Sequence, residues 1–281
     1  MQSRKARCAA AVSAALLGAS ACTTASLPEG PEIARFQSEY PEFGLTRGPD
    51  GWYLTRMEGL FGTGAPSRIL RYPFDGGGPV KMDFPGSGSQ SDFSYSPVTG
   101  EAFYVSESDI RALRWDEELG WQGGDLVGAL NTPGYEASPQ RAADGWLYYA
   151  SMTDGGFGQG DIHRARLVGD EWQVELLGPD INSPTGEWNL AVSPDGKAMV
   201  FEASGRPTNL SLSGDLYLSC NVDGVWQKAV PMAGLNTAYS DLDFRFTGPR
   251  EGVFTTAMIE GDGALRHAGP EHFQSCEEPV G

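Results

Sequence analysis

From residue 193 the chain reads Ser193-Pro194-Asp195-Gly196-Lys197, and the apolar run Ala198-Met199-Val200-Phe201 follows directly. An Asp-Gly pair before a β-rich run is typical of a tight hairpin turn, because glycine adopts the positive φ angles that such turns require. The chain continues with Gly214-Asp215-Leu216-Tyr217, then Asp223-Gly224-Val225-Trp226, and then Leu235-Asn236-Thr237. This order predicts a unit of short strands that are separated by turns.

The unit recurs along the chain with a period of about 50 residues. A turn glycine followed by a strand-like run is found at Gly51, Gly100, Gly145, Gly196 and Gly252. A third strand-like segment begins at Asp109, Asp161 and Asp215, and a fourth carries Trp121, Trp172 or Trp226. Such a period indicates a solenoid or a propeller, and four short strands in each repeat are the pattern of a β-propeller blade.

The best repeat, residues 193–237, resembles the PD40 repeat of WD40-like, TolB-type propellers, and residues 136–187 resemble it well. Residues 37–91 and 241–273 match less closely, and the second repeat lacks the Asp before its glycine. The resemblance implies an all-β propeller, for which this chain supplies about five four-stranded blades, although TolB-like propellers often have six. It also implies a protein of the bacterial cell envelope.

Closure of the ring is expected to use the start of the mature chain. The last repeat contains three strand-like segments and ends near His272. Residues 32–36 stand just before the innermost strand of the first repeat, where a fourth strand of the last blade would be. We expect this segment to complete the final blade as a strand, because closure removes the exposed sheet edges that invite aggregation.

The N-terminus has the features of a secretory signal. Arg4, Lys5 and Arg7 precede a short apolar run at residues 9–17, and Ala19-Ser20-Ala21-Cys22 follows. We expect a signal peptide at 1–21, a lipidated tether at 22–30 and the propeller domain at 31–281. Two processing routes stay open, since Ala19-Ser20-Ala21 fits ordinary signal peptidase, whereas Ala19 to Cys22 resembles a lipobox in which Ala19 replaces the usual Leu.

Cysteine parity favours lipidation of Cys22. Cys8 leaves with the signal, so a lipid on Cys22 leaves Cys220 and Cys276 as an even pair that could form a disulfide in an oxidising compartment. Among such lipoproteins, Thr23 after the Cys implies sorting to the outer membrane. We therefore expect a lipoprotein on the periplasmic side of the outer membrane, with the soluble periplasm as the alternative and contact with the membrane only through the anchor.

The charge of the chain limits its partners. It contains 37 Asp and Glu against 20 Lys and Arg, a formal net charge of −17. Nucleic acid is excluded as a partner, because phosphate binding needs a basic patch. An acidic exterior fits a soluble, self-repelling surface. From the resemblance to TolB-type repeats and the export signal we expect a monomeric propeller that binds an envelope protein or a glycan.

Each repeat also carries one carboxylate shortly before its turn. These residues are Glu42, Asp92, Glu136, Glu187 and Asp241. In the last three repeats the carboxylate stands five residues after the linker Asn, which is Asn131, Asn182 or Asn236. The first strand of a propeller blade lines the central channel, so we expect the five carboxylates to form a ring near one channel mouth.

Two roles are open for this ring. Each carboxylate could accept N–H bonds at the start of its strand and orient the linker, as short polar groups do in turns, and we favour this role. Alternatively, the ring could hold a ligand or a cation, because like charges at about 8 Å repel by about 2 kcal/mol per pair at an effective dielectric near 20. Oxygen ligands favour a hard ion such as calcium. We expect no cofactor, with calcium as the alternative.

Two classes of function follow. The first is a non-enzymatic binding or scaffold protein at the envelope. The alternative is an enzyme similar to the five-bladed-propeller glycoside hydrolases, in which channel carboxylates about 5–9 Å apart serve as acid and base. Recurrence in every blade favours the first class, because catalysis needs inequivalent residues with separated pKa values. The sequence contains no zinc-ligand spacing, P-loop or nucleophile elbow, so we assign no catalytic residue and no metal ligand.

Overall fold

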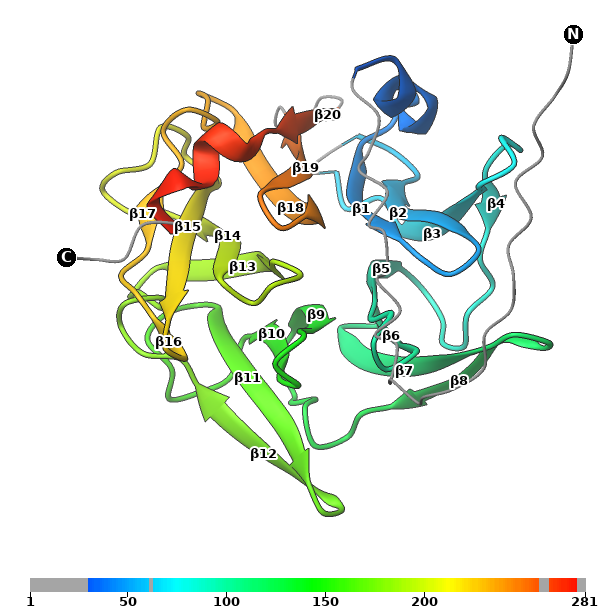
Figure 1. The fold of residues 1–281 in the computed structure, drawn as a ribbon, viewed down its shortest axis with the longest axis horizontal. Helices are drawn as coiled ribbons and strands as arrows, with labels where there is room; N and C mark the ends of the chain where they lie inside the picture. Colours follow the sequence, from blue (N-terminus) through cyan, green and yellow to red (C-terminus); the bar gives the residue numbers. More distant parts are fainter. Residues whose placement is uncertain (1–29, 61–62, 258–262, 277–281) are drawn as a thin grey trace, which may run out of the picture.

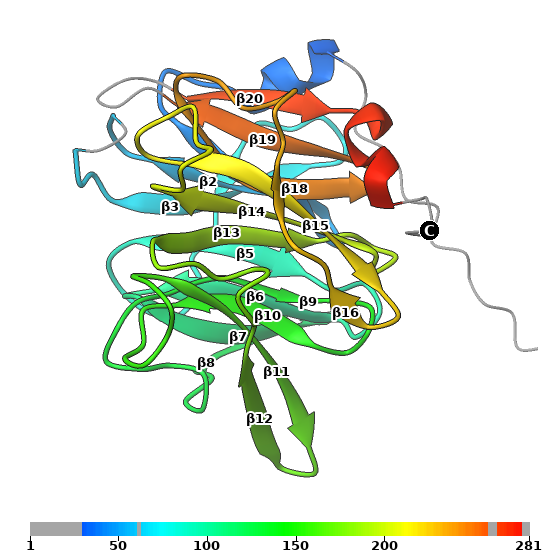
Figure 2. The same ribbon diagram turned by 90° about the vertical axis from the view of Figure 1, so that its left-hand side faces the viewer.

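The computed structural model describes residues 30–60, 63–257 and 263–276. They form an all-β propeller in which five antiparallel blades surround a central axis (Figure 1). The predicted fold class is confirmed. In every blade the first strand along the chain is innermost, and the side view shows the blades stacked around the ring (Figure 2). The predicted signal peptide and Cys22 lie outside the described residues.

The first three blades have four strands each. Blade 1 consists of β1 (Glu42–Arg47), β2 (Gly51–Met57), β3 (Ser67–Pro73) and β4 (Val80–Lys81). Blade 2 consists of β5 (Gln90–Tyr95), β6 (Glu101–Ser106), β7 (Asp109–Asp116) and β8 (Gly120–Leu126). Blade 3 consists of β9 (Glu136–Arg141), β10 (Leu147–Ser151), β11 (Asp161–Val168) and β12 (Glu171–Leu176).

The last two blades depart from this plan. Blade 4 consists of β13 (Gly186–Val192), β14 (Ala198–Ser204), β15 (Asp215–Val222) and β16 (Val225–Trp226), and β17 (Val230–Pro231) also pairs with β15. Blade 5 consists of β18 (Ser240–Gly248), β19 (Glu251–Ala257) and β20 (Gly263–Ala268). Within the described residues no fourth strand pairs with β20.

The turns between first and second strands explain the glycine pattern. Gly100, Gly145 and Gly196 have φ angles of +70°, +86° and +71°, as the hairpin signal predicts. Gly51 serves a different purpose, because a Cβ there would lie 2.6 Å from the backbone oxygen of Tyr72 in the neighbouring strand. The repeated glycine therefore has two physical causes.

The segment at residues 32–36 is not the strand that the sequence predicted. Residues Gly30–Phe36 form a 3-10 helix, η1. Ile33 and Phe36 are buried, and the intervening residues are exposed. A 3-10 helix has three residues per turn, so these two side chains share one face, whereas a strand would point them to opposite sides. They pack between blades 1 and 5, against residues that include Leu54 and Leu265.

The last described segment of the chain packs on blade 4. A second 3-10 helix, η2 (Pro270–Cys276), follows β20 and packs against β15. Its Phe273 is fully buried, and its ring centre lies 5.9 Å from that of Phe244 and 5.5 Å from that of Phe246. Cys276 and Cys220 form a disulfide with a Cα–Cα distance of 5.1 Å. The bridge joins β15 to η2, beyond the end of β20.

The core lies mainly between neighbouring blades. One cluster combines Val200 and Leu216 of blade 4 with Phe244 and Phe254 of blade 5. Tyr53 and Tyr148 are fully buried and belong to this core. Neither η1 nor η2, the two helices of the described residues, has the length and apolar character needed to cross a membrane.

Candidate functional site

Four of the predicted ring carboxylates stand at the start of the innermost strand of their blades. They are Glu42, Glu136, Glu187 and Asp241, and none is more than 1 % exposed. In blades 3, 4 and 5 the carboxylate accepts the backbone N–H of the linker residue four positions earlier. The bonds run from Thr132 to Glu136 (3.1 Å), from Ser183 to Glu187 (2.9 Å) and from Thr237 to Asp241 (2.5 Å). Each carboxylate therefore fixes the linker that leads into its blade.

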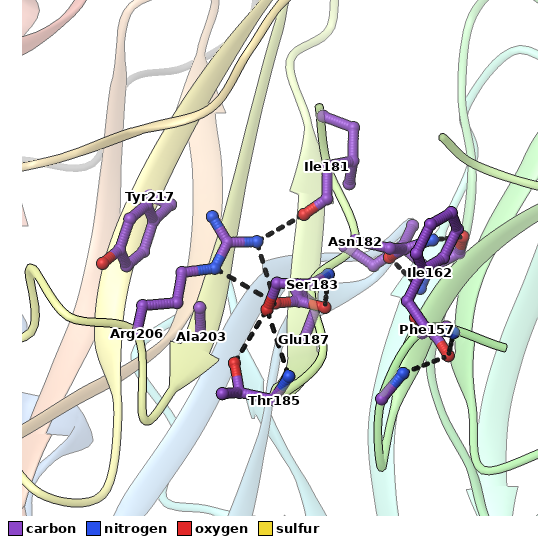
Figure 3. A network of polar contacts seen from close by, with 12 residues as sticks. Phe157, Ile162, Ile181, Asn182, Ser183, Thr185, Glu187, Ala203, Arg206 and Tyr217 are labelled. Carbon is purple, nitrogen blue, oxygen red and sulfur yellow. Dashed lines mark hydrogen bonds and ion pairs between the residues drawn. The ribbon is translucent and has the colours of Figure 1, made fainter. Parts of the chain in front are cut away.

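Glu187 shows the arrangement in most detail (Figure 3). The Ser183 hydroxyl donates to it at 2.5 Å, and the Arg206 guanidinium lies 2.8 Å away. Arg206 also donates to the backbone oxygen of Ile181 and lies over the Tyr217 ring, 4.5 Å from its centre. Burial raises the pKa of Glu187, and the bonds from Ser183 and Arg206 oppose this rise. The carboxylate is thus engaged inside its own blade.

The linker asparagines have a role that the sequence did not reveal. Each side chain pairs with the backbone N–H and C=O of one residue in the third strand of the preceding blade. The pairs are Asn131 with Ile110, Asn182 with Ile162, and Asn236 with Leu216, at distances of 2.7–3.0 Å. The recurring Asn was visible in the sequence, but its partner lies 20 or 21 residues earlier in the chain, in the preceding blade. Together, the Asn and the carboxylate clamp each linker at both ends.

Asp92 does not share the place of the other four carboxylates. The first residue of β5 is Gln90, whose amide donates to the backbone oxygen of Phe84 at 2.8 Å. Asp92 comes two residues later, inside a β-bulge, with a φ of +56°. The linker before blade 2 lacks the Asn that fixes the register in blades 3 to 5. The predicted ring therefore has four members, with Gln90 in the position of the fifth.

The four carboxylates are closed off by the linkers that they hold. A ligand would reach them only if those linkers moved, because their exposure is at most 1 %. In the part of the chain that the structure describes, no group of three or more His, Cys, Asp or Glu side chains is arranged to hold a metal ion. The hydrogen bonds of these carboxylates are those expected for residues that orient the linkers, which is the first of the two roles considered for them.

A second layer of polar residues lies deeper along the axis. All five innermost strands have a β-bulge at the same place. The residues with positive φ in these bulges are Gly44, Asp92, Ser138, Asn189 and Asp243, with φ between +49° and +65°. Gly, Asn and Asp tolerate this left-handed region better than other residues. A Gly, Asn or Asp two places after the ring position was the signal in the sequence for four of the five blades, and Ser138 is the exception.

Arg245 joins two side chains of this bulge layer. Its guanidinium lies 2.6 Å from Oδ1 of Asp243 and 3.6 Å from Oδ1 of Asp92, and all three residues are buried. Burial raises the pKa of Asp243 to about 7, with Asp92 adding to the rise and Arg245 opposing it. The layer therefore contains a buried ion cluster.

The cluster continues into blade 4. The Ser138 hydroxyl lies 3.3 Å from Asp92 and 3.1 Å from the side-chain oxygen of Asn189. The Asn189 amide in turn donates to Glu202 at 2.6 Å. Burial raises the pKa of Glu202 to about 7, and the bond from Asn189 opposes this rise. These contacts connect blades 2, 3, 4 and 5 around the axis.

A cavity of about 220 Å³ opens at the end of the axis opposite the linkers. We call it the funnel. Its lining comes from the ends of the five innermost strands and the turns after them, at residues 46–48, 94–98, 140–143, 192–194 and 245–247, together with Trp52. Because every blade contributes, the funnel exists only when the ring is closed.

The funnel is cationic and aromatic. Its lining includes Arg47, Arg141 and Arg245, and no Asp or Glu is found among the described lining residues. Arg141 pairs at 3.2 Å with Glu101, which lies outside the lining, and Arg245 belongs to the ion cluster. Arg47 is exposed and lies over the Phe74 ring, 5.1 Å from its centre.

Comparison with solved structures returns several matches of low sequence identity. TolB from Acinetobacter baumannii is 15 % identical, with a TM-score of 0.46, over 73 % of this chain and 47 % of that chain. A nidogen/laminin complex is 13 % identical, with a TM-score of 0.47, over 78 % of this chain and 73 % of that chain. A protein of unknown function from Dyadobacter fermentans is 9 % identical, with a TM-score of 0.48, over 86 % and 83 %.

The chain spans about half the length of the TolB chain. It spans about a third of a puromycin-hydrolyzing peptidase from Mycobacterium tuberculosis, which is 13 % identical, with a TM-score of 0.45, over 82 % of this chain and 35 % of that one. At these identities the similarity concerns the fold alone. No family model matches the chain. No curated protein matches it either.

Proposed function

We propose that this chain is an exported binding protein of the bacterial envelope, and that it holds its partner at the funnel. The observation that carries the proposal is a cavity to which all five blades contribute and whose described lining contains no carboxylate, in a chain with a net charge of −17. The N-terminal signal features support export, and Ala19-Ser20-Ala21-Cys22 supports a lipid anchor. The partner is an envelope protein or a glycan.

Binding fits the polar groups better than catalysis does. The glycoside-hydrolase alternative needs carboxylates within reach of a substrate. The ring carboxylates are occupied by the linkers, and Asp92 and Asp243 are 6 % and 5 % exposed and paired with Arg245. A glycosidase mechanism would require these groups to be uncovered. The lining of the funnel instead offers guanidinium, aromatic, hydroxyl and aliphatic groups.

Site-directed photo-cross-linking in intact cells tests the proposal. A photoreactive phenylalanine replaces Val98, which is 76 % exposed in the funnel lining. The matched control replaces Leu119, which is 71 % exposed in the same blade but outside the lining. We expect a reproducible adduct from position 98 and none from position 119, with mass spectrometry identifying the partner.

The outcomes separate the alternatives. Equal adducts from positions 98 and 119, or no adduct from position 98, would reject the funnel as the partner site. Replacement of Cys22 by Ser tests the anchor on its own, since loss of the lipid should release the protein into the soluble periplasmic fraction. The change at Cys22 does not alter the funnel, so the lipid anchor and partner binding at the funnel are tested independently.

A further inference from the structure

Resting on this proposed function, we infer that the funnel receives an apolar group that carries a carboxylate, and that Arg47 is the charge partner of that carboxylate. The ligand is the end of a peptide chain of the envelope partner, and a small organic acid presents the same chemistry to the funnel.

The charges of the funnel lining favour an anionic ligand. Three arginines meet in the lining, although acidic residues outnumber basic ones 37 to 20 in the chain. Two of them are neutralised, since Arg141 pairs with Glu101 and Arg245 with Asp243. Among the described residues no carboxylate lies within 4 Å of the Arg47 guanidinium. A concave site with low-dielectric walls concentrates the field of such a charge, so the funnel attracts an anion.

Arg47 is restrained at the funnel by its strand and by a neighbouring ring. It is the last residue of β1, so its backbone is fixed by pairing with Trp52 in β2. Its guanidinium lies over Phe74, and the Phe74 ring meets the Trp52 ring edge to face at 6.5 Å. Stacking of this kind restrains a long side chain while its N–H donors stay free. Arg47 is therefore held at the funnel wall, ready to bind an anion.

The size and the lining of the funnel fit a small apolar group. Ligand pockets for drug-sized molecules usually measure about 300–1,000 Å³, whereas this cavity measures about 220 Å³. It has room for one side chain or a comparably small molecule. Trp52, Tyr95 and Phe246 give the lining a large aromatic share, and Val192 adds aliphatic surface. An apolar body with one anionic end satisfies both the walls and Arg47.

The test uses the exported full-length protein and two matched probes. N-acetyl-L-phenylalanine carries the carboxylate, and N-acetyl-L-phenylalanine amide lacks it. Binding is followed by ¹⁵N chemical shifts, including the indole N–H of Trp52, which a Trp52→Phe spectrum assigns. We expect the acid to bind at least about tenfold more tightly than the amide, because a charge-assisted hydrogen bond contributes that much.

Variants of Arg47 decide the assignment. Arg47→Met should lower the affinity for the acid to that for the amide, and Arg47→Lys should restore part of the difference. Arg114→Met makes the same change at an exposed arginine outside the lining and should leave both affinities unchanged. A shorter acid such as acetate should bind more weakly than N-acetyl-L-phenylalanine if the apolar walls contribute.

Failure of the inference can be told from failure of the proposed function. If acid and amide bind equally, and Val98→Trp weakens both, the funnel binds ligands but the carboxylate assignment is wrong. If Arg47→Met leaves the preference for the acid intact, another group holds the anion and the assignment to Arg47 is wrong. If neither probe binds, the inference is overturned, whereas the funnel as a partner site is judged by the adduct at position 98. A peptide and its amidated form then distinguish a chain end from a free acid.

Discussion

The guanidinium of Arg245 in blade 5 lies 3.6 Å from the carboxylate of Asp92 in blade 2. Blade 1 stands between these blades in the ring, and its bulge residue is Gly44. A Cβ at Gly44 would lie 3.3 Å from the Asp243 carboxylate and 3.7 Å from the Arg245 guanidinium. The ion pair therefore uses the space that the glycine leaves, and it ties together two blades that do not adjoin.

Replacement of Arg245 by Met should destabilise the protein strongly. Asp92 and Asp243 would then be buried without their counter-charge, and removal of one partner from a buried pair typically costs about 3–5 kcal/mol. The loss should be smaller at pH 5 than at pH 8, because the pKa of Asp243 is raised to about 7 and the carboxyl can take a proton. Urea unfolding at both pH values measures the free energy of unfolding.

The control for this prediction is Arg114→Met, which removes an exposed arginine from β7. A second variant, Arg245→Met with Asp243→Asn, should recover part of the lost stability, since one of the two uncompensated charges is gone. A loss for Arg245→Met no greater than that for Arg114→Met would show that the ion cluster does not support the fold.

Removal of an Asn side chain that holds a linker should lower the free energy of unfolding most where that side chain is most deeply buried. Asn182 is 2 % exposed and bonds to both backbone groups of Ile162 and to the oxygen of Leu177. Asn182→Ala leaves the buried Ile162 N–H and the Leu177 oxygen unsatisfied, at about 1–3 kcal/mol for each, whereas the Ile162 oxygen keeps its bond from the Leu177 N–H. We expect a loss of about 3 kcal/mol, measured by urea unfolding.

The chain supplies its own comparison for this clamp. Asn131 makes the equivalent pair of bonds to Ile110 in a half-buried setting, where water can replace the lost partner. Asn131→Ala should therefore cost clearly less than Asn182→Ala. Equal losses for the two variants would mean that the bonds themselves, and not their burial, determine the cost.

The period of the blades could be predicted from the sequence because each turn has a local cause. The positive φ at Gly145 and Gly196 favours glycine whatever the tertiary contacts are, so these turns can be recognised in the sequence alone. The closing segment could not be predicted in the same way. Its Ile33 and Phe36 are three residues apart, a spacing that fits a 3-10 helix, but only blades 1 and 5 together provide the apolar surface that selects it.

The site was less predictable than the fold, for a related reason. The five carboxylates were counted from the turn, whereas the strand register is set by linker contacts, which blade 2 makes differently through Gln90. The funnel draws Arg47, Arg141 and Arg245 from three repeats that are far apart in the chain. Only closure of the ring brings them to one cavity, and no spacing in the sequence carries that information.

The disulfide should contribute substantially to stability. Cys220 and Cys276 are separated by 56 residues, and the chain-entropy model assigns about 4 kcal/mol to a bridge that closes such a segment. Cys276→Ser should lower the free energy of unfolding by an amount of this order, and Cys220→Ser by the same amount. The double variant should lose no more than either single variant, because each already opens the bridge.

Thiol labelling checks the bridge itself. In the native protein, denatured without reductant, neither Cys220 nor Cys276 should react with a thiol-specific reagent, and both should react after reduction. Labelling of both residues before reduction would show that the bridge does not form in the cell. In that case the two Ser variants should also leave stability unchanged.

Glu202 should make the fold more stable in mild acid than in mild base. Burial raises its pKa from 4.5 to about 7, so the folded state binds the proton more tightly than the unfolded state. This contribution is fully present below about pH 4.5 and is lost as the pH rises through about 7. A pKa difference of this size corresponds to about 3 kcal/mol between the two ends of the range.

The variant Glu202→Gln removes the titration and keeps an acceptor for the amide of Asn189, which bonds to Glu202 at 2.6 Å. Its free energy of unfolding should therefore fall less than that of the unmodified protein between pH 5 and pH 8. Glu117→Gln makes the same change at an exposed site and should leave the pH profile unaltered. The profile should not become flat in the Glu202 variant, because Asp243 also has a raised pKa and titrates in the same range. Parallel profiles for the two proteins would mean that Glu202 is ionised in the fold throughout this range, and that its bond to Asn189 outweighs its burial.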